Sequence, residues 1–353
     1  MMDDAAPAAA VPAPASQALP YGSDENGLIC GYHFLPGEAA TELVSAEQAL
    51  PLVREPGAGF VWLHLNVGHA AAQRWLRSHA GLTDNFYEAL HQGSRSTRIE
   101  RDEDTLFAVM NDVTFDFTFD ASDVATLWVA VRPGLVVTAR RHPLRSVDRL
   151  RLAVKRGEQL DSSVALLDHL LGDQADELQR IVRLATDRID DIEDAVLAGH
   201  HASHSGELAQ LRRLMVRLQR LLAPEPSALQ RTLSKPPAWV AADDVAHLHR
   251  ASEEFSLVLR DITALQERIK LMQDESSVRV AEENNRSLFM LTMVTVLALP
   301  INLTSGMFGM NVGGIPLGEH PYGFWIMVAL IATLTGVIAA IALRRIRSPG
   351  PPR

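Results

Sequence analysis

The chain has 353 residues, a formal net charge of −10 and a single cysteine, Cys30. One cysteine excludes an internal disulfide framework and any CxxC zinc or redox site, and we interpret Cys30 as a small buried strand residue rather than a reactive thiol. The length allows about two or three domains, and most of the apolar excess lies after residue 287.

The N-terminal part predicts a short tail followed by an α/β domain. Residues 1–20 are acidic and rich in Ala and Pro, which is typical of a disordered tail and not of a signal peptide. Residues 21–160 form the predicted cytoplasmic α/β domain, with helical stretches around 70–91 and 143–156. The apolar and alternating runs, several joined by turn signals such as RDED and RPG, predict strands at 27–35, 59–66, 96–101, 105–115, 124–131 and 134–141.

Residues 161–235 predict a helical hairpin whose turn is GHHASHSG, residues 199–206. Three histidines lie in or beside this turn, and imidazole is a good ligand for zinc, although an ordinary surface turn explains them as well. The first helix carries an acidic face that is either a solvated surface or a cation site. The histidines are His200, His201 and His204, and the acidic face is Asp187, Asp190, Asp191 and Asp194.

Residues 236–308 predict one long stalk helix that continues into the membrane. No proline occurs between Pro237 and Pro300, so a helix from about Ala241 to Phe308 would span roughly 100 Å. Apolar residues at alternating steps of three and four predict a coiled-coil-like packing face: Leu248, Ala251, Phe255, Val258, Ile262, Leu265, Ile269 and Met272. Beyond Met272, the positions at the same steps of three and four are polar. This side of the helix therefore either lines a water-filled vestibule or is simply exposed to solvent.

Two uncharged segments, residues 288–308 and 322–343, are each long enough to cross ~30 Å of hydrocarbon as a helix. Arginines precede the first segment and follow the second, whereas the loop at 309–321 has no Lys or Arg. The positive-inside rule therefore places both termini, including the basic tail at 344–353, in the cytoplasm and the loop outside. Two buried core helices are the alternative, but they need no arginine flanks.

Polar residues recur on one side of the first span. Asn285, Thr292, Thr295, Asn302 and Ser305 follow one another at steps of seven, three, seven and three, with leucines between them. Such a side faces water or protein rather than lipid, so it either lines a pore made by several copies or bonds helix to helix. Pro300 either frees a backbone carbonyl or only kinks the span. No nucleotide-binding or hydrolase motif occurs, so we predict no enzyme, no required cofactor and no nucleic-acid partner.

The residues around the first span resemble the CorA-type divalent-cation transporter superfamily. Gly309-Met310-Asn311 comes directly after the first of two C-terminal spans, behind a stalk containing NNRSLFMLTMVT, and a basic tail follows the second span. The continuation NVGGIP, followed by HPYGFW, resembles the ZntB branch of zinc transporters. Only residues 284–325 carry the resemblance at the level of motifs.

The resemblance implies a funnel-shaped homopentamer in the bacterial inner membrane, with first spans lining the pore. Asn311 would ring the outer mouth, shaped by Gly309 and Met310, and leucine rings would act as hydrophobic gates. The basic residues Arg344, Arg345 and Arg347 would surround the inner end. The implied pore-lining residues are Asn285, Leu288, Leu291, Thr295, Leu299 and Asn302.

The cargo expected from the resemblance is a divalent cation, zinc before magnesium, cobalt, nickel or cadmium. Magnesium-like members carry acids soon after the GMN motif, whereas here the first acid is Glu319. The ZntB branch couples entry to protons, for which Glu319 or His320 is the candidate titrating group in the outer loop. A CorA-like magnesium, cobalt or nickel channel and a two-span membrane scaffold or sensor are the alternatives.

Overall fold

The computed structural model describes residues 22–55, 57, 59–92, 97–198, 204–310 and 320–347. Its contacts divide the chain into two compact units, one ending at Met272 and the other beginning at Gln273. The division falls inside the longest helix.

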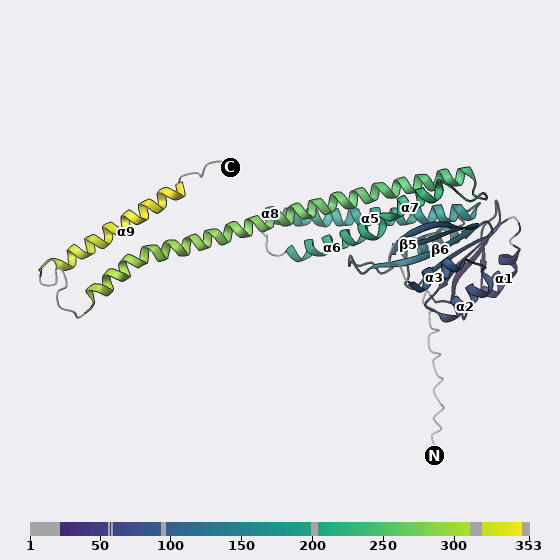
Figure 1. The fold of residues 1–353 in the computed structure, drawn as a ribbon, viewed down its shortest axis with the longest axis horizontal. Helices are drawn as coiled ribbons and strands as arrows, with labels where there is room; N and C mark the ends of the chain where they lie inside the picture. Colours follow the sequence, from purple (N-terminus) through teal and green to yellow (C-terminus); the bar gives the residue numbers. More distant parts are fainter. Residues whose placement is uncertain are drawn as a thin grey trace, which may run out of the picture. The chain divides into compact units, whose positions relative to one another are not determined.

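The first unit is built on a seven-stranded mixed sheet with the order β2-β1-β3-β7-β6-β5-β4 (Figure 1). Only β3 and β7 pair in parallel. The strands are β1 Leu28–Phe34, β2 Thr41–Leu43, β3 Phe60–Asn66, β4 Arg98–Asp102, β5 Thr105–Val113, β6 Val124–Arg132 and β7 Leu135–Arg140. All six predicted strands are present, and β2 is an addition.

Two tight turns set the register of the antiparallel strands. The RDED turn pairs Asp102 with Thr105, and Glu103 has a φ of 53°. The RPG turn pairs Arg132 with Leu135. Cys30 is buried within β1, as predicted, and burial raises the pKa of its thiol to about 12, so this cysteine is inert at neutral pH.

Helices cover both faces of the sheet (Figure 1). Their apolar side chains form two separate hydrophobic cores with it. One face is covered by α1 Ala46–Arg54, α2 Ala70–His79 and α3 Asp84–Gln92. The other is covered by α4 Arg145–Lys155, the start of α5 Ser163–Leu197, and α7 Pro224–Leu233. The α1 and α7 helices were not predicted.

The third core joins α5, α6 Ser205–Leu222 and the first part of α8 Ala242–Phe308. The predicted apolar stripe of α8 is buried from Leu248 to Ile269, and Met272 is half-buried. The long helix and its packing face are therefore confirmed, and the face packs largely against other helices of the same chain. The second unit contains the rest of α8 and α9 Gly323–Arg347.

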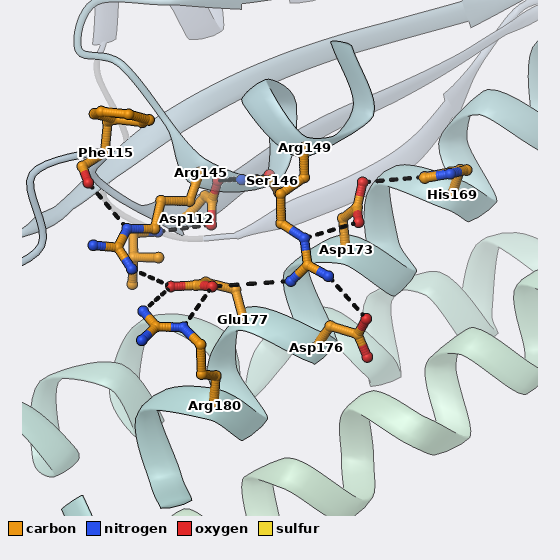
Figure 2. A network of polar contacts seen from close by, with 11 residues as sticks. Asp112, Phe115, Arg145, Ser146, Arg149, His169, Asp173, Asp176, Glu177 and Arg180 are labelled. Carbon is orange, nitrogen blue, oxygen red and sulfur yellow. Dashed lines mark hydrogen bonds and ion pairs between the residues drawn. The ribbon is translucent and has the colours of Figure 1, made fainter. Parts of the chain in front are cut away.

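A network of polar contacts fixes α4 against α5 (Figure 2). Glu177 of α5 accepts from Arg145 at 2.6 Å and from Arg180 at 2.5 Å, and its side chain is only 5% exposed. Burial raises the pKa of Glu177, but the hydrogen bonds from the two arginines outweigh it and hold the pKa below its ordinary value. The carboxylate is thus a charged anchor between the two helices.

We expect Glu177→Ala to lower the free energy of unfolding by about 3 kcal/mol, because the change leaves part-buried arginines without their shared carboxylate. Asp176→Ala is the matched control, since Asp176 is the adjacent residue and its side chain is 65% exposed. Its loss should cost less than about 1 kcal/mol. Denaturant unfolding of the detergent-solubilised protein measures both, and equal effects would contradict the anchoring role.

Candidate ion-transport site

Two described helices are long and apolar enough to cross a membrane. The windows in α8 and α9 have mean hydropathies of 1.8 and 2.1, and 0% and 6% of their residues are buried within the subunit. Helices of a soluble core would be buried, so the alternative of two core helices does not fit the described chain. Tyr322, Phe324 and Trp325 are at least 66% exposed at the start of α9, as interfacial aromatic residues are.

The six predicted pore-lining residues lie along one side of α8. Successive members are three or four residues apart, so a rotation of about 100° per residue keeps them all within an arc of roughly 120°. All six are exposed in the described chain: Asn285, Leu288, Leu291, Thr295, Leu299 and Asn302. The opposite side is largely exposed as well, so the alternation of amide, hydroxyl and leucine groups, not exposure, distinguishes this side.

Threonine hydroxyls on this part of α8 present oxygen acceptors to the helix surface. Thr292 Oγ1 donates to the Leu288 carbonyl at 2.8 Å, and Thr295 Oγ1 donates to the Leu291 carbonyl at 2.9 Å. Each hydroxyl hydrogen is therefore directed inward, while the oxygen lone pairs remain available. Neutral oxygens of this kind suit contact with a cation or with its hydration shell.

The predicted GMN motif follows directly on the last turn of α8. The Gly309 amide donates to the Ser305 carbonyl at 2.9 Å, and a Cβ at this glycine would lie 3.1 Å from the same oxygen. A side chain at this position would therefore crowd the end of the helix. Met310 is 54% exposed. Asn311 and Glu319 lie outside the described residues.

His320 lies directly before α9 and caps its first turn. The amide of Tyr322 donates to His320 Nδ1 at 3.2 Å, and the amide of Gly323 donates to the His320 carbonyl at 2.9 Å. Because Nδ1 accepts, the neutral ring carries its proton at Nε2. The ring and the carbonyl of His320 therefore both accept hydrogen bonds from backbone amides at the start of α9.

The candidate cytoplasmic metal ligands do not come together in the described part of the chain. His204 Nδ1 lies 3.7 Å from a Glu207 carboxylate oxygen, and the other two turn histidines lie outside the described residues. The four aspartates of α5 are exposed, and Asp190 forms an ion pair with Arg268 at 2.6 Å. Among the residues described, no group of three His, Cys, Asp or Glu side chains could hold a metal ion.

Comparison with known proteins places this arrangement in a family. The profile of CorA-like Mg2+ transporter proteins matches residues 57–345. The chain belongs to the CorA-like Mg2+ transporter family. The divalent cation transporter CmaX of Pseudomonas aeruginosa is 30% identical over 313 residues, 87% of this chain and 93% of CmaX. The zinc transport protein ZntB of Pectobacterium carotovorum subsp. carotovorum is 24% identical over 278 residues, 79% of this chain and 85% of ZntB.

Solved structures share the fold. The full-length CmaX structure matches with a TM-score of 0.77 and 26% identity, covering 92% of this chain and 99% of that one. The CorA magnesium transporter from Methanocaldococcus jannaschii matches with a TM-score of 0.71 and 20% identity, covering 88% and 96%. The predicted fold, an α/β domain with a long helix and a second C-terminal helix, is confirmed. As a CorA-family member, the protein is a divalent cation transporter and not an enzyme.

Two buried carboxyl groups were not singled out by the sequence. They lie in the first unit, which ends at Met272 and is called the soluble unit from here on. Burial raises the pKa of Glu225 to about 8, and the negative charge of Asp112 contributes to this rise. A hydrogen bond from Gln174 lowers the pKa but does not offset the effect of burial. Burial likewise raises the pKa of Asp112 to about 6, although Ser146 and the Val113 amide donate to it. A charged residue inside a largely apolar strand, and a glutamate between two prolines, were the visible signals.

We expect the stability of the soluble unit to fall as the pH rises from about 5 to about 8. The raised pKa of Glu225 means that the folded protein keeps a proton which the unfolded chain releases above its ordinary value of 4.5. This contribution is complete below pH 4.5 and is lost as the pH passes about 8. Glu225→Gln should flatten the decline in apparent Tm, whereas Glu253→Gln, at an exposed position of α8, should keep it. Parallel pH profiles for wild type and Glu225→Gln would refute this assignment.

Proposed function

We propose that the chain is a zinc transporter of the bacterial inner membrane, assembled as a homopentamer with both termini in the cytoplasm. The first spans line a central pore, and the GMN motif, Gly309, Met310 and Asn311, forms its outer mouth. The stripe of amide, hydroxyl and leucine groups on α8 is the observation that carries the proposal.

The length of the stripe supports a pore over simple helix-to-helix contact. From Asn285 to Asn302 it extends 17 residues, roughly 26 Å at ~1.5 Å per residue, which is close to the ~30 Å thickness of the hydrocarbon. A polar contact between two helices needs only one or two such groups. A cation pathway needs polar groups spread over the thickness of the membrane, and one helix cannot enclose it, so several copies must surround an axis.

The cargo assignment rests on the loop chemistry and on the relatives. The residues after Asn311 are uncharged as far as Glu319, and His320 is the one imidazole between residues 284 and 325. Imidazole is a preferred zinc ligand, whereas magnesium sites are built from oxygen groups. Relatives that include the zinc transport protein ZntB support the same choice.

Uptake into proteoliposomes tests the cargo and the coupling ion together. The purified protein is supplied with Zn²⁺ or Mg²⁺ while the internal pH is recorded. Zinc uptake with internal acidification is the expected result. Magnesium uptake without a pH change would replace the proposal with a CorA-like channel, and no flux of either ion would favour a two-span scaffold.

Glu319 and His320 are our proposed proton-responsive groups. We expect the double variant Glu319→Gln and His320→Gln to lose the pH dependence of zinc uptake, because neither amide titrates and the His320 ring no longer caps α9. The two single variants show which group is responsible. Zinc uptake by the double variant with a pH profile like that of the wild type would end this hypothesis.

A further inference from the structure

An open groove of about 510 Å³ lies between the edge strand β4 and helix α7 of the soluble unit. None of the residues that line it belongs to α8 or α9, and it has no part in the proposed transport pathway. Its charged lining residues are Arg98, Glu100, Arg101, Arg231 and Lys235.

Fixed contacts hold the two walls of the groove together. Thr232 of α7 donates to the Ile99 carbonyl of β4 at 2.7 Å, so the helix covers the edge strand at this position. Thr97, just before β4, donates to the Leu221 carbonyl of α6 at 2.7 Å. The groove is therefore preorganised by hydrogen bonds between elements that are distant in sequence.

The groove is strongly basic in a chain whose net charge is −10. Four cationic side chains line it against one carboxylate, Glu100, and within the described residues none of the four forms an ion pair. Elsewhere in the same unit, arginines such as Arg145 and Arg268 have carboxylate partners. Four cationic side chains without a carboxylate partner in the described chain, which line one groove, favour an anionic ligand.

Arg98 adds a separate observation. Its Nε is buried, and in the part of the chain that the structure describes it has no hydrogen-bond partner. A buried N–H group without a partner is costly, so proteins normally satisfy it with a ligand or with water. The guanidinium group binds phosphate oxygens through parallel N–H donors, and Arg98 is one of the residues that line the groove.

We propose that the groove between β4 and α7 binds a phosphate-bearing anion carrying two or three linked phosphate groups. The volume of the groove lies within the range of small-molecule sites and is larger than a single inorganic ion requires. One carboxylate gives no ligand set for the transported cation itself. A metal-free triphosphate carries more negative charge than its complex with a divalent cation, so the groove binds the metal-free form more tightly and responds to cation supply.

Calorimetric titration of the full-length protein with tripolyphosphate, in buffer free of divalent ions, tests the site without any transport step. Arg98→Gln with Arg231→Gln should weaken the Kd at least about tenfold, which corresponds to ~1.4 kcal/mol. The matched control, Arg54→Gln with Arg156→Gln, removes the same charge from exposed positions outside the groove and should stay within about twofold. Arg98→Lys keeps the charge but loses the Nε donor, so an intermediate loss is expected.

Two further measurements test the effect of a divalent cation and identify the source of the phosphate. Excess Mg²⁺ over tripolyphosphate should weaken binding to the wild type. Vesicles containing phosphatidic acid replace tripolyphosphate in a parallel titration, and a variant effect confined to vesicles assigns the site to a lipid headgroup. Equal Kd values for wild type and the Arg98→Gln, Arg231→Gln variant would overturn the proposal. It would also be overturned if the wild type did not bind tripolyphosphate and the variant lost its oligomeric state on size exclusion. That result would assign the groove to contact between copies of the chain.

Discussion

Replacing Asn311 with alanine should reduce zinc uptake into proteoliposomes at least about tenfold. In the proposed pentamer each Asn311 amide contacts the hydration shell of the arriving cation, and a hydrogen bond involving a charged group is worth ~1.5–3 kcal/mol. Loss of ~1.4 kcal/mol already corresponds to about tenfold, and the change removes one such contact from every subunit.

The neighbouring substitution Val312→Ala is the control for this experiment, because it shortens an adjacent side chain without removing a polar group. Its uptake should match that of the wild type. Size exclusion and thermal unfolding verify that the Asn311 variant assembles and folds. Wild-type uptake by a correctly assembled Asn311→Ala protein would show that the selectivity position lies elsewhere.

The central sheet could be predicted because its signals are local. Apolar alternation marked six strands, and the RDED and RPG turns close the hairpins where expected. The α1 helix was not predicted, although Ser45 and Gln48 form a capping pair at its start; Pro51 inside it is a residue that ordinarily disfavours a helix. The α7 helix was not predicted either, although proline is favoured in the first turn of a helix, where Pro224 lies.

The membrane helices were predictable for a different reason. Hydrocarbon cannot satisfy polar groups, so charge is excluded over a fixed length and the remaining polar residues gather on one side. The soluble unit has no such constraint. Glu177 meets Arg145 across 32 positions in the chain, and Thr232 meets Ile99 across 133. These contacts depend on how the helices pack on one another and on the sheet, which residue spacing alone does not determine.

Replacing Leu299 with serine should raise the basal cation flux of the transporter several-fold. Leu299 is 64% exposed and lies between Thr295 and Asn302 on the same side of α8. In the proposed pentamer five such leucines form an apolar constriction that excludes water and hydrated ions when the pore is closed. Serine is smaller and polar, so water can occupy the constriction and the barrier falls. Flux of Zn²⁺ into proteoliposomes without a pH gradient measures the change.

Leu297→Ser is the matched control, because the same substitution two residues earlier lies about 200° around the helix. It removes the same apolar surface from the side that should face lipid or the second span, and its basal flux should equal that of the wild type. Contact between helices without a pore predicts a different pattern, in which Leu299→Ser weakens assembly and leaves no flux to compare. Equal increases in both variants would show that loosened packing, rather than a wetted constriction, admits the ion. The pair therefore tests which side of α8 faces the cation, independently of which cation the pore selects.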